Sequence, residues 1–292
     1  MSKLLLIAPV SLLVLAACST ETASTEASAP EADPAPAEAV VEAAAPEAEA
    51  PMEEAALCEG FGPQTPRDIS LTSGTNSVMF DLAPPATELN LCNIHTHTQA
   101  EHKAPGFSVF AGPGPSGGFQ CNETADLTEA ELTAAPGAYE GVVPGDTIEV
   151  HWVHSSCPIQ PGEGLGSCLS DGCDNPFLRV EAQSFLVVND PEALDFMDFA
   201  ATVQTDAGLW QASAIPSDTG EPVLFRGSTT GPSYDQATCS PLQVTWNVRP
   251  MCAKLDINSL HRWAESGNVF NETKSHGVRE LVTAPELLSA IE

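Results

Sequence analysis

The stretch LNLCNIHTH, from Leu89 to His97, alternates along its length as a β-strand with one buried face does. In a strand, residues i and i+2 point to the same face, so His95 and His97 project side by side. Two imidazoles in this arrangement have the geometry needed to grip one metal ion. The stretch therefore predicts a strand that carries part of a metal site.

A second stretch, TIEVHWVH (147–154), follows a Pro-Gly-Asp turn and places Glu149 and His151 on one face. If this strand lies beside the first, His151 completes three nitrogen ligands. The fourth tetrahedral position of zinc then stays open, as in catalytic zinc sites. Glu149 can accept the other ring N–H of a ligand histidine and fix its tautomer. We interpret His102 and His154 as structural partners of the site rather than ligands.

The rest of the chain also reads as short strands bounded by Gly and Pro, with few helical patterns. Strand-like runs occupy 76–82, 106–112, 177–190, 220–228 and 242–248. Possible helices occupy 128–134, 191–200, 259–266 and 284–292. We therefore expect a mainly β domain with a sizeable sheet and peripheral helices.

The first 17 residues have the pattern of a secretory signal: Lys3, then an apolar run too short to span a membrane. The run ends in Ala-Ala-Cys, which resembles the lipobox of bacterial lipoproteins. That resemblance implies a lipid on Cys18, with Ser19 favouring the outer membrane. We expect an exported protein, held at the bacterial outer membrane by this lipid and facing the periplasm or the exterior.

Residues 18–56 follow as an expected tether between this lipid and the folded domain. From 19 to 56 the chain holds ten acidic residues and no Lys, Arg or His. Its charges repel one another, and its apolar side chains are too small to offset the entropy lost on folding. Residues 57–292 contain no second linker and are expected to form one domain. The formal net charge of −30 excludes nucleic acid as a partner held by its phosphates.

Eight cysteines remain besides Cys18, and an even number in an exported chain predicts up to four disulfides. A zinc–thiolate site is excluded because the sequence has no C-x-x-C pair. The pairing is open among Cys58, Cys92, Cys121, Cys157, Cys168, Cys173, Cys239 and Cys252.

Several enzyme families place an H-x-H motif at a metal. The metallo-β-lactamase pattern requires Asp at the position of Gln99 and fails here. The cupin pattern fits His95-x-His97-x₃-Glu101 and would make Glu101 a direct metal ligand. Two positions, Leu89 and Ser155, depart from the cupin motifs. A cupin-type metal enzyme and a non-catalytic zinc-binding lipoprotein therefore stay as alternatives.

The full pattern, H-x-H-x₃-E-H followed by E-x-H-x-x-H, resembles the alpha-class carbonic anhydrases. QTPRDI (64–69) and FRGSTTGP (225–232) are similar to two further segments of that class. AEHKAPGF, EVHWVHSSC and NPFLRVEAQSFLVVND are similar to the delta class of algae and marine bacteria. The resemblance runs roughly from 58 to 250 and implies a central twisted, mostly antiparallel sheet stapled by disulfides. It also implies reversible hydration of CO₂ to bicarbonate and a proton.

The same resemblance implies roles for individual residues. One zinc ion per chain would be held by His95, His97 and His151, and zinc in carbonic anhydrases lowers the pKa of its water to about 7. Thr230 matches the hydroxyl that orients the attacking oxygen, and Glu101 matches the carboxylate that accepts the hydrogen bond of the threonine hydroxyl. The matching candidates for an apolar wall around CO₂ are Val153, Val244 and Trp246. At the usual proton-shuttle position stand Thr75 and Asn76, which cannot carry protons at neutral pH.

Overall fold

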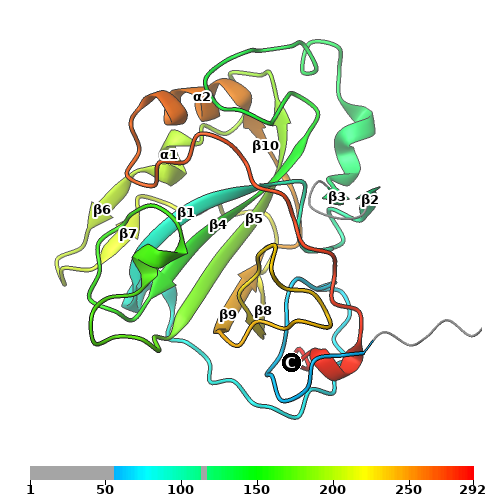
Figure 1. Ribbon diagram of the computed structural model, residues 1–292. Helices are drawn as coiled ribbons and strands as arrows, with labels where there is room; N and C mark the ends of the chain where they lie inside the picture. Colours follow the sequence, from blue (N-terminus) through cyan, green and yellow to red (C-terminus); the bar gives the residue numbers. More distant parts are fainter. Residues whose placement is uncertain (1–55, 113–116) are drawn as a thin grey trace, which may run out of the picture. The chain divides into compact units, whose positions relative to one another are not determined.

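The computed structural model describes residues 56–112 and 117–292. Its main feature is a six-stranded mixed sheet in the order β1-β4-β5-β9-β8, with β10 also paired to β5 (Figure 1). The pairs β1–β4, β4–β5 and β8–β9 are antiparallel, whereas β9 and β10 run parallel to β5. The strands are β1 Asn90–Thr98, β4 Thr147–Ser155, β5 Leu178–Val188, β8 Val223–Ser228, β9 Gln243–Val248 and β10 Ala253–Asp256.

The other elements are short, which confirms the predicted mainly β architecture. Two small hairpins and two α-helices accompany the sheet: β2 Val109–Gly112 with β3 Gly118–Gln120, β6 Thr202–Gln204 with β7 Trp210–Ala212, α1 Met197–Ala200, and α2 Ile257–Glu265. Four 3₁₀ turns are η1 Ala86–Glu88, η2 Asn122–Asp126, η3 Leu165–Cys168 and η4 Pro285–Leu287. The predicted signal peptide 1–17, the lipid site at Cys18 and residues 18–55 of the tether lie outside the described residues.

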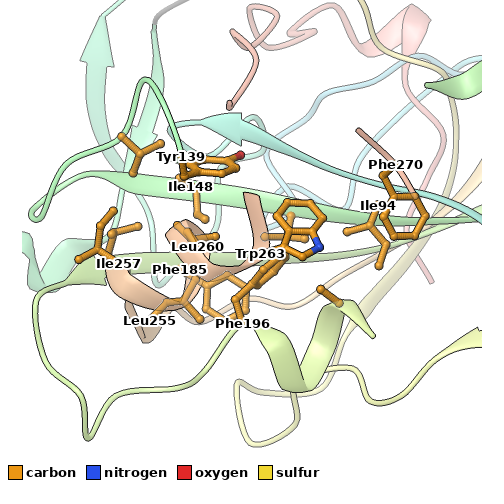
Figure 2. Packing of buried hydrophobic residues seen from close by; sticks show 14 of the residues in the cluster. Ile94, Tyr139, Ile148, Phe185, Phe196, Leu255, Ile257, Leu260, Trp263 and Phe270 are labelled. Carbon is orange, nitrogen blue, oxygen red and sulfur yellow. The ribbon is translucent and has the colours of Figure 1, made fainter. Parts of the chain in front are cut away.

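The inner strand β4, between β1 and β5, is buried along all nine of its residues because both faces of the sheet are covered. On one face, Ile148 and Trp152 belong to the main hydrophobic core. Figure 2 shows Ile148 in this core together with Leu260 and Trp263 of helix α2. On the other face lie Glu149, His151 and Val153. Strand alternation thus separates an apolar layer, which fixes the sheet, from a layer that is free to carry polar chemistry.

Four elements expected from the sequence differ from the structure. Residues 76–82 pair with no strand of the described chain, since their apolar side chains have no covered face (Met79 is 71% exposed). Residues 128–134 form turns, in which the Thr128 backbone N–H donates to Glu131 and no longer helix follows. The expected helices 191–200 and 284–292 shrink to α1 and η4. Helix α2 forms as expected, with its N-cap Asp256 accepting from Asn258 N–H.

All eight predicted cysteines form disulfides, and the pairing is now defined. The bridges are Cys58–Cys239, Cys92–Cys168, Cys121–Cys252 and Cys157–Cys173. The bridge Cys92–Cys168 links β1 to η3. Because Cys92 is three residues before His95, the strand that carries the predicted metal ligands is covalently linked to a neighbouring loop. No helix in the described part of the chain is long and apolar enough to cross a membrane.

Candidate metal centre

The antiparallel register of β1 and β4 brings the two histidine motifs together. His95 lies directly opposite His151, and His97 lies opposite Glu149. The ring centroids of the three histidines are 4.7 to 5.1 Å apart. Their ligand nitrogens all lie within 4.8 Å of one another. The structure therefore assembles the three predicted ligands at one point on the polar face of the sheet.

Each of these histidines has one ring nitrogen held by an outer partner and one turned inward. The outer partners are Asn93 Oδ1 at 2.7 Å from His95 Nδ1, Gly277 O at 3.1 Å from His97 Nδ1, and Glu149 Oε1 at 2.9 Å from His151 Nε2. Of the inward nitrogens, His95 Nε2 and His151 Nδ1 are 3.3 Å apart. His97 Nε2 is buried and has no hydrogen-bond partner among the described residues. Such convergent, outwardly anchored imidazoles fit a zinc ion with one open position.

The protonation state of the histidines also suits metal binding. Burial, followed by the neighbouring His151, holds the pKa of His95 well below its usual value. Burial likewise lowers the pKa of His97. Neutral imidazole is the form that donates to a metal, so both side chains are ligand-ready at neutral pH.

Glu149 is completely buried and accepts four hydrogen bonds. Its Oε1 accepts from His102 Nδ1 at 2.7 Å and from His151 Nε2 at 2.9 Å. Its Oε2 accepts from the backbone N–H groups of Glu101 at 2.7 Å and His102 at 3.1 Å. Burial alone would raise the pKa of Glu149, but His102 and His151 hold that pKa well below its usual range. Glu149 is thus an ionised carboxylate that orients His151.

The turn after β1 explains the spacing between the H-x-H pair and Glu101-His102. Gln99 adopts a left-handed backbone conformation with φ of 66°, and its N–H donates to Thr147 O at 2.7 Å. The chain therefore leaves the strand direction and returns toward β4. This return places the N–H groups of Glu101 and His102 on the Glu149 carboxylate.

Glu101 is buried close to the histidines. Its Oε1 accepts from the backbone N–H of Arg279 at 3.3 Å, and its Oε2 has no partner among the described residues. Glu101, His102 and His151 also form a second set of ligand atoms within 4.8 Å of one another. The free nitrogen of His151 faces His95, however, and its other nitrogen is taken by Glu149. The geometry thus favours the three-histidine set.

Two cavities flank this cluster. One is mainly apolar, has a volume of about 220 Å³, and is lined by Val153, Val244 and Trp246 together with His95 and His151. The other is more polar, has a volume of about 620 Å³, and is lined by His95, His97, Glu101 and Arg279. Thr230 lines both cavities. The predicted hydrogen bond from Thr230 to Glu101 stays a prediction.

His154 lies on the opposite face of β4 from the metal centre. Its ring is buried, and its Nδ1 is 3.1 Å from Trp152 O. Burial lowers the pKa of His154 to about 4. His154 therefore packs in the apolar layer and does not contact the histidine cluster. His102, in contrast, is linked to the cluster through Glu149.

This burial predicts an acid-dependent loss of stability. Below the unfolded pKa of about 6.5, the unfolded chain takes up a proton that folded His154 refuses, so stability falls until the pH reaches about 4. The full cost is about 3 kcal/mol. We expect His154→Gln to lose correspondingly less stability between pH 7 and pH 4.5 than wild type. Urea unfolding at both pH values measures this, and an equal loss in the two proteins would contradict it.

Several residues at the centre escaped the sequence analysis. The segment 272–279 runs along β1: Glu272 Oε1 accepts from Thr96 N–H at 3.0 Å, and His276 N–H donates to Thr96 O at 2.8 Å. The same segment supplies Gly277 and Arg279. It carries no recognisable motif, and His276 and His261 both read as ordinary surface or core residues. His261 is a buried residue of α2, with its Nε2 2.8 Å from Ala135 O. His276, in contrast, lines the polar cavity.

Comparison with known proteins shows the family to which the chain belongs. Residues 86–259 match the family model described as delta carbonic anhydrase. No curated protein matches the chain. Among solved structures, Photobacterium profundum alpha-carbonic anhydrase has 19% identity and a TM-score of 0.27, over 77% of this chain and 87% of that one. Alpha-carbonic anhydrase from Thermovibrio ammonificans, in complex with the inhibitor sulfanilamide, has 14% identity and a TM-score of 0.22, over 73% and 82%. The matched segment contains β1, β4 and all three histidines, and the chain belongs to the delta carbonic anhydrase family, enzymes that interconvert carbon dioxide and bicarbonate.

Proposed function

We propose that this carbonic anhydrase works with one zinc ion held by His95, His97 and His151. The observation that carries the proposal is the set of three inward ring nitrogens between an apolar and a polar cavity. One of these nitrogens is buried and has no hydrogen-bond partner in the described part of the chain. When bound in carbonic anhydrases, zinc supplies a nucleophilic oxygen at neutral pH by lowering the pKa of its water to about 7.

The surrounding residues divide the remaining work. Val153, Val244 and Trp246 form an apolar wall that can hold CO₂, a molecule without charge, beside the histidines. Thr230 orients the attacking oxygen toward this wall. Glu101, as the acceptor of a hydrogen bond from the Thr230 hydroxyl, fixes which lone pair the threonine presents. Bicarbonate is charged, and the polar cavity beside the histidines is a more favourable surrounding for it than the apolar wall.

Stopped-flow CO₂ hydration tests the proposal directly. The zinc-loaded protein should accelerate hydration, the chelator-stripped protein should not, and re-addition of zinc should restore the rate. A fully zinc-loaded protein whose rate equals that of buffer would contradict the mechanism and would favour the non-catalytic zinc-binding alternative.

Glu101 separates the proposed mechanism from the cupin alternative. If Glu101 acts through Thr230, Glu101→Gln should keep one zinc per chain while turnover falls by roughly 10²-fold, as when a group that orients the transition state is removed. If Glu101 is a ligand, the same change should release the metal. Zinc analysis by mass spectrometry, combined with hydration rates on the same sample, distinguishes the two outcomes.

We also propose that the protein is exported and anchored through a lipid on Cys18 to the bacterial outer membrane. The Leu-Ala-Ala-Cys sequence supports the anchor, and four disulfides are typical of an oxidising compartment. Labelling with a radioactive fatty acid in a bacterial host should mark wild type but not Cys18→Ala. Equal labelling, or none in wild type, would contradict the anchor.

A further inference from the structure

Gln64 is a completely buried amide in which all four hydrogen-bonding positions are used. Its Nε2 donates to Gly62 O at 2.7 Å and to Ser240 O at 3.2 Å. Its Oε1 accepts from Ser228 Oγ at 2.9 Å and from Ser240 N–H at 3.1 Å. Two carbonyl groups on one side and a backbone N–H on the other fix the orientation of the amide. Gln64 thus joins three segments of the chain that are distant in sequence.

Those bonds converge on the end of β8, immediately before Thr230. Thr65, the neighbour of Gln64, donates through Oγ1 to Ser228 O at 2.5 Å and accepts from Ser228 N–H at 3.1 Å. Thr229 Oγ1 lies 2.5 Å from Ser240 Oγ. Ser228 and Thr229, which precede Thr230 in the chain, are therefore fixed by a buried polar network centred on Gln64.

Among the residues that the structure describes, no such network surrounds Thr230. Thr230 lines both cavities beside His95, and Gly231 follows with φ of 141°, a backbone conformation that L side chains rarely adopt. Ser228 and Thr229 therefore fix the backbone position from which the Thr230 side chain projects, while Glu101 orients its hydroxyl in the proposed function. A displacement of about 1 Å in such a group can cost roughly 10²-fold in rate.

We propose that Gln64 is a positioning residue for the reaction: it fixes Ser228 and Ser240, and through them the hydroxyl of Thr230, without touching substrate or metal. The inference rests on the proposed function, in which Thr230 orients the attacking oxygen. It gives the buried QTP segment (64–66) a role in turnover that is separate from its role in packing.

A double-mutant cycle tests this role. Gln64→Met keeps the volume of the side chain and removes all four hydrogen bonds. With full zinc occupancy, we expect it to lower kcat by about tenfold or more in the wild-type background, because Thr230 is displaced. In the Thr230→Ala background, the same change should lower kcat no further. Equal losses in both backgrounds would show a general structural effect and overturn the inference.

Gln183 offers a matched control. It is also a fully buried amide, with Nε2 donating to Ser184 O at 2.7 Å and Met251 O at 2.8 Å, and Oε1 accepting from Thr219 Oγ1 at 2.6 Å. Gln183→Met should lower the melting temperature as Gln64→Met does but leave kcat at the wild-type value. A fall in kcat equal to that of Gln64→Met would also overturn the inference.

Hydrogen exchange gives a readout that does not depend on activity. Thr229 N–H donates to Leu242 O at 3.1 Å, so peptides covering 226–232 should exchange faster in Gln64→Met and at the wild-type rate in Gln183→Met. If Gln64→Met fails to fold, Ser228→Ala removes one bond of the network and enters the same cycle. If Thr230→Ala lowers kcat but Gln64→Met keeps the wild-type kcat, only the positioning role of Gln64 is refuted. A wild-type rate in Thr230→Ala would refute both this role and the function proposed for Thr230.

Discussion

Replacing His151 by alanine is expected to release the zinc and to lower CO₂ hydration by on the order of 10³-fold or more, because the nucleophile at neutral pH depends on the metal. The two imidazoles of β1 would remain, but the third ligand, which Glu149 orients, would be lost. Zinc content and stopped-flow rates on the same preparation measure this. The fold should persist, since the apolar layer and the four disulfides do not involve His151.

His154→Gln is the matched control for that change. It removes an imidazole from the same strand but from the opposite face, where the ring contacts Trp152 O. This variant should retain one zinc per chain and the wild-type hydration rate. A His151→Ala protein that still held zinc and turned over at the wild-type rate would exclude His151 as a ligand.

Glu149→Gln is expected to have the second largest effect, on stability and on zinc affinity together. An amide cannot accept on both of its atoms, so its NH₂ group would face either two backbone N–H groups or two imidazole donors. Disruption of a buried, paired charge costs about 3 to 5 kcal/mol. Loss of the group that orients a ligand histidine weakens metal binding by about 10- to 100-fold. Urea unfolding and competition with a zinc chelator measure the two effects.

Glu181 provides the comparison for Glu149→Gln. It is another buried carboxylate of the sheet, paired with Arg179 at 2.9 Å and Arg249 at 3.3 Å. Glu181→Gln should destabilise the fold while leaving zinc affinity unchanged. If Glu149→Gln binds zinc as tightly as Glu181→Gln does, Glu149 has no role in orienting the metal ligands.

The strands that carry the metal centre could be predicted from the sequence for a physical reason. Alternation in a strand fixes which side chains share a face, so His95 and His97 had to lie together, and Glu149 had to accompany His151. Short-range geometry was sufficient for these pairs. The placement of one pair opposite the other depended on strand pairing, which the structure now shows in the β1–β4 register.

The features that the sequence did not predict depend on long-range contacts. The segment 272–279 supplies Gly277 to His97 and Arg279 to Glu101 through backbone atoms, which leave no side-chain signature. Disulfide pairing, such as Cys92 with Cys168, likewise depends on which loops meet in space. The run 76–82 alternates like a strand but pairs with no other described segment, since alternation indicates only a preference for the strand conformation and pairing decides whether a strand forms.

The central claim is that zinc lies between His95, His97 and His151. Anomalous diffraction at the zinc edge, on crystals of the zinc-loaded protein, tests it most directly. We expect one strong peak within coordination distance of His95 Nε2, His97 Nε2 and His151 Nδ1, with Glu101 outside that distance. A peak bound by Glu101 and His102 instead, or no peak at the three histidines, would contradict it.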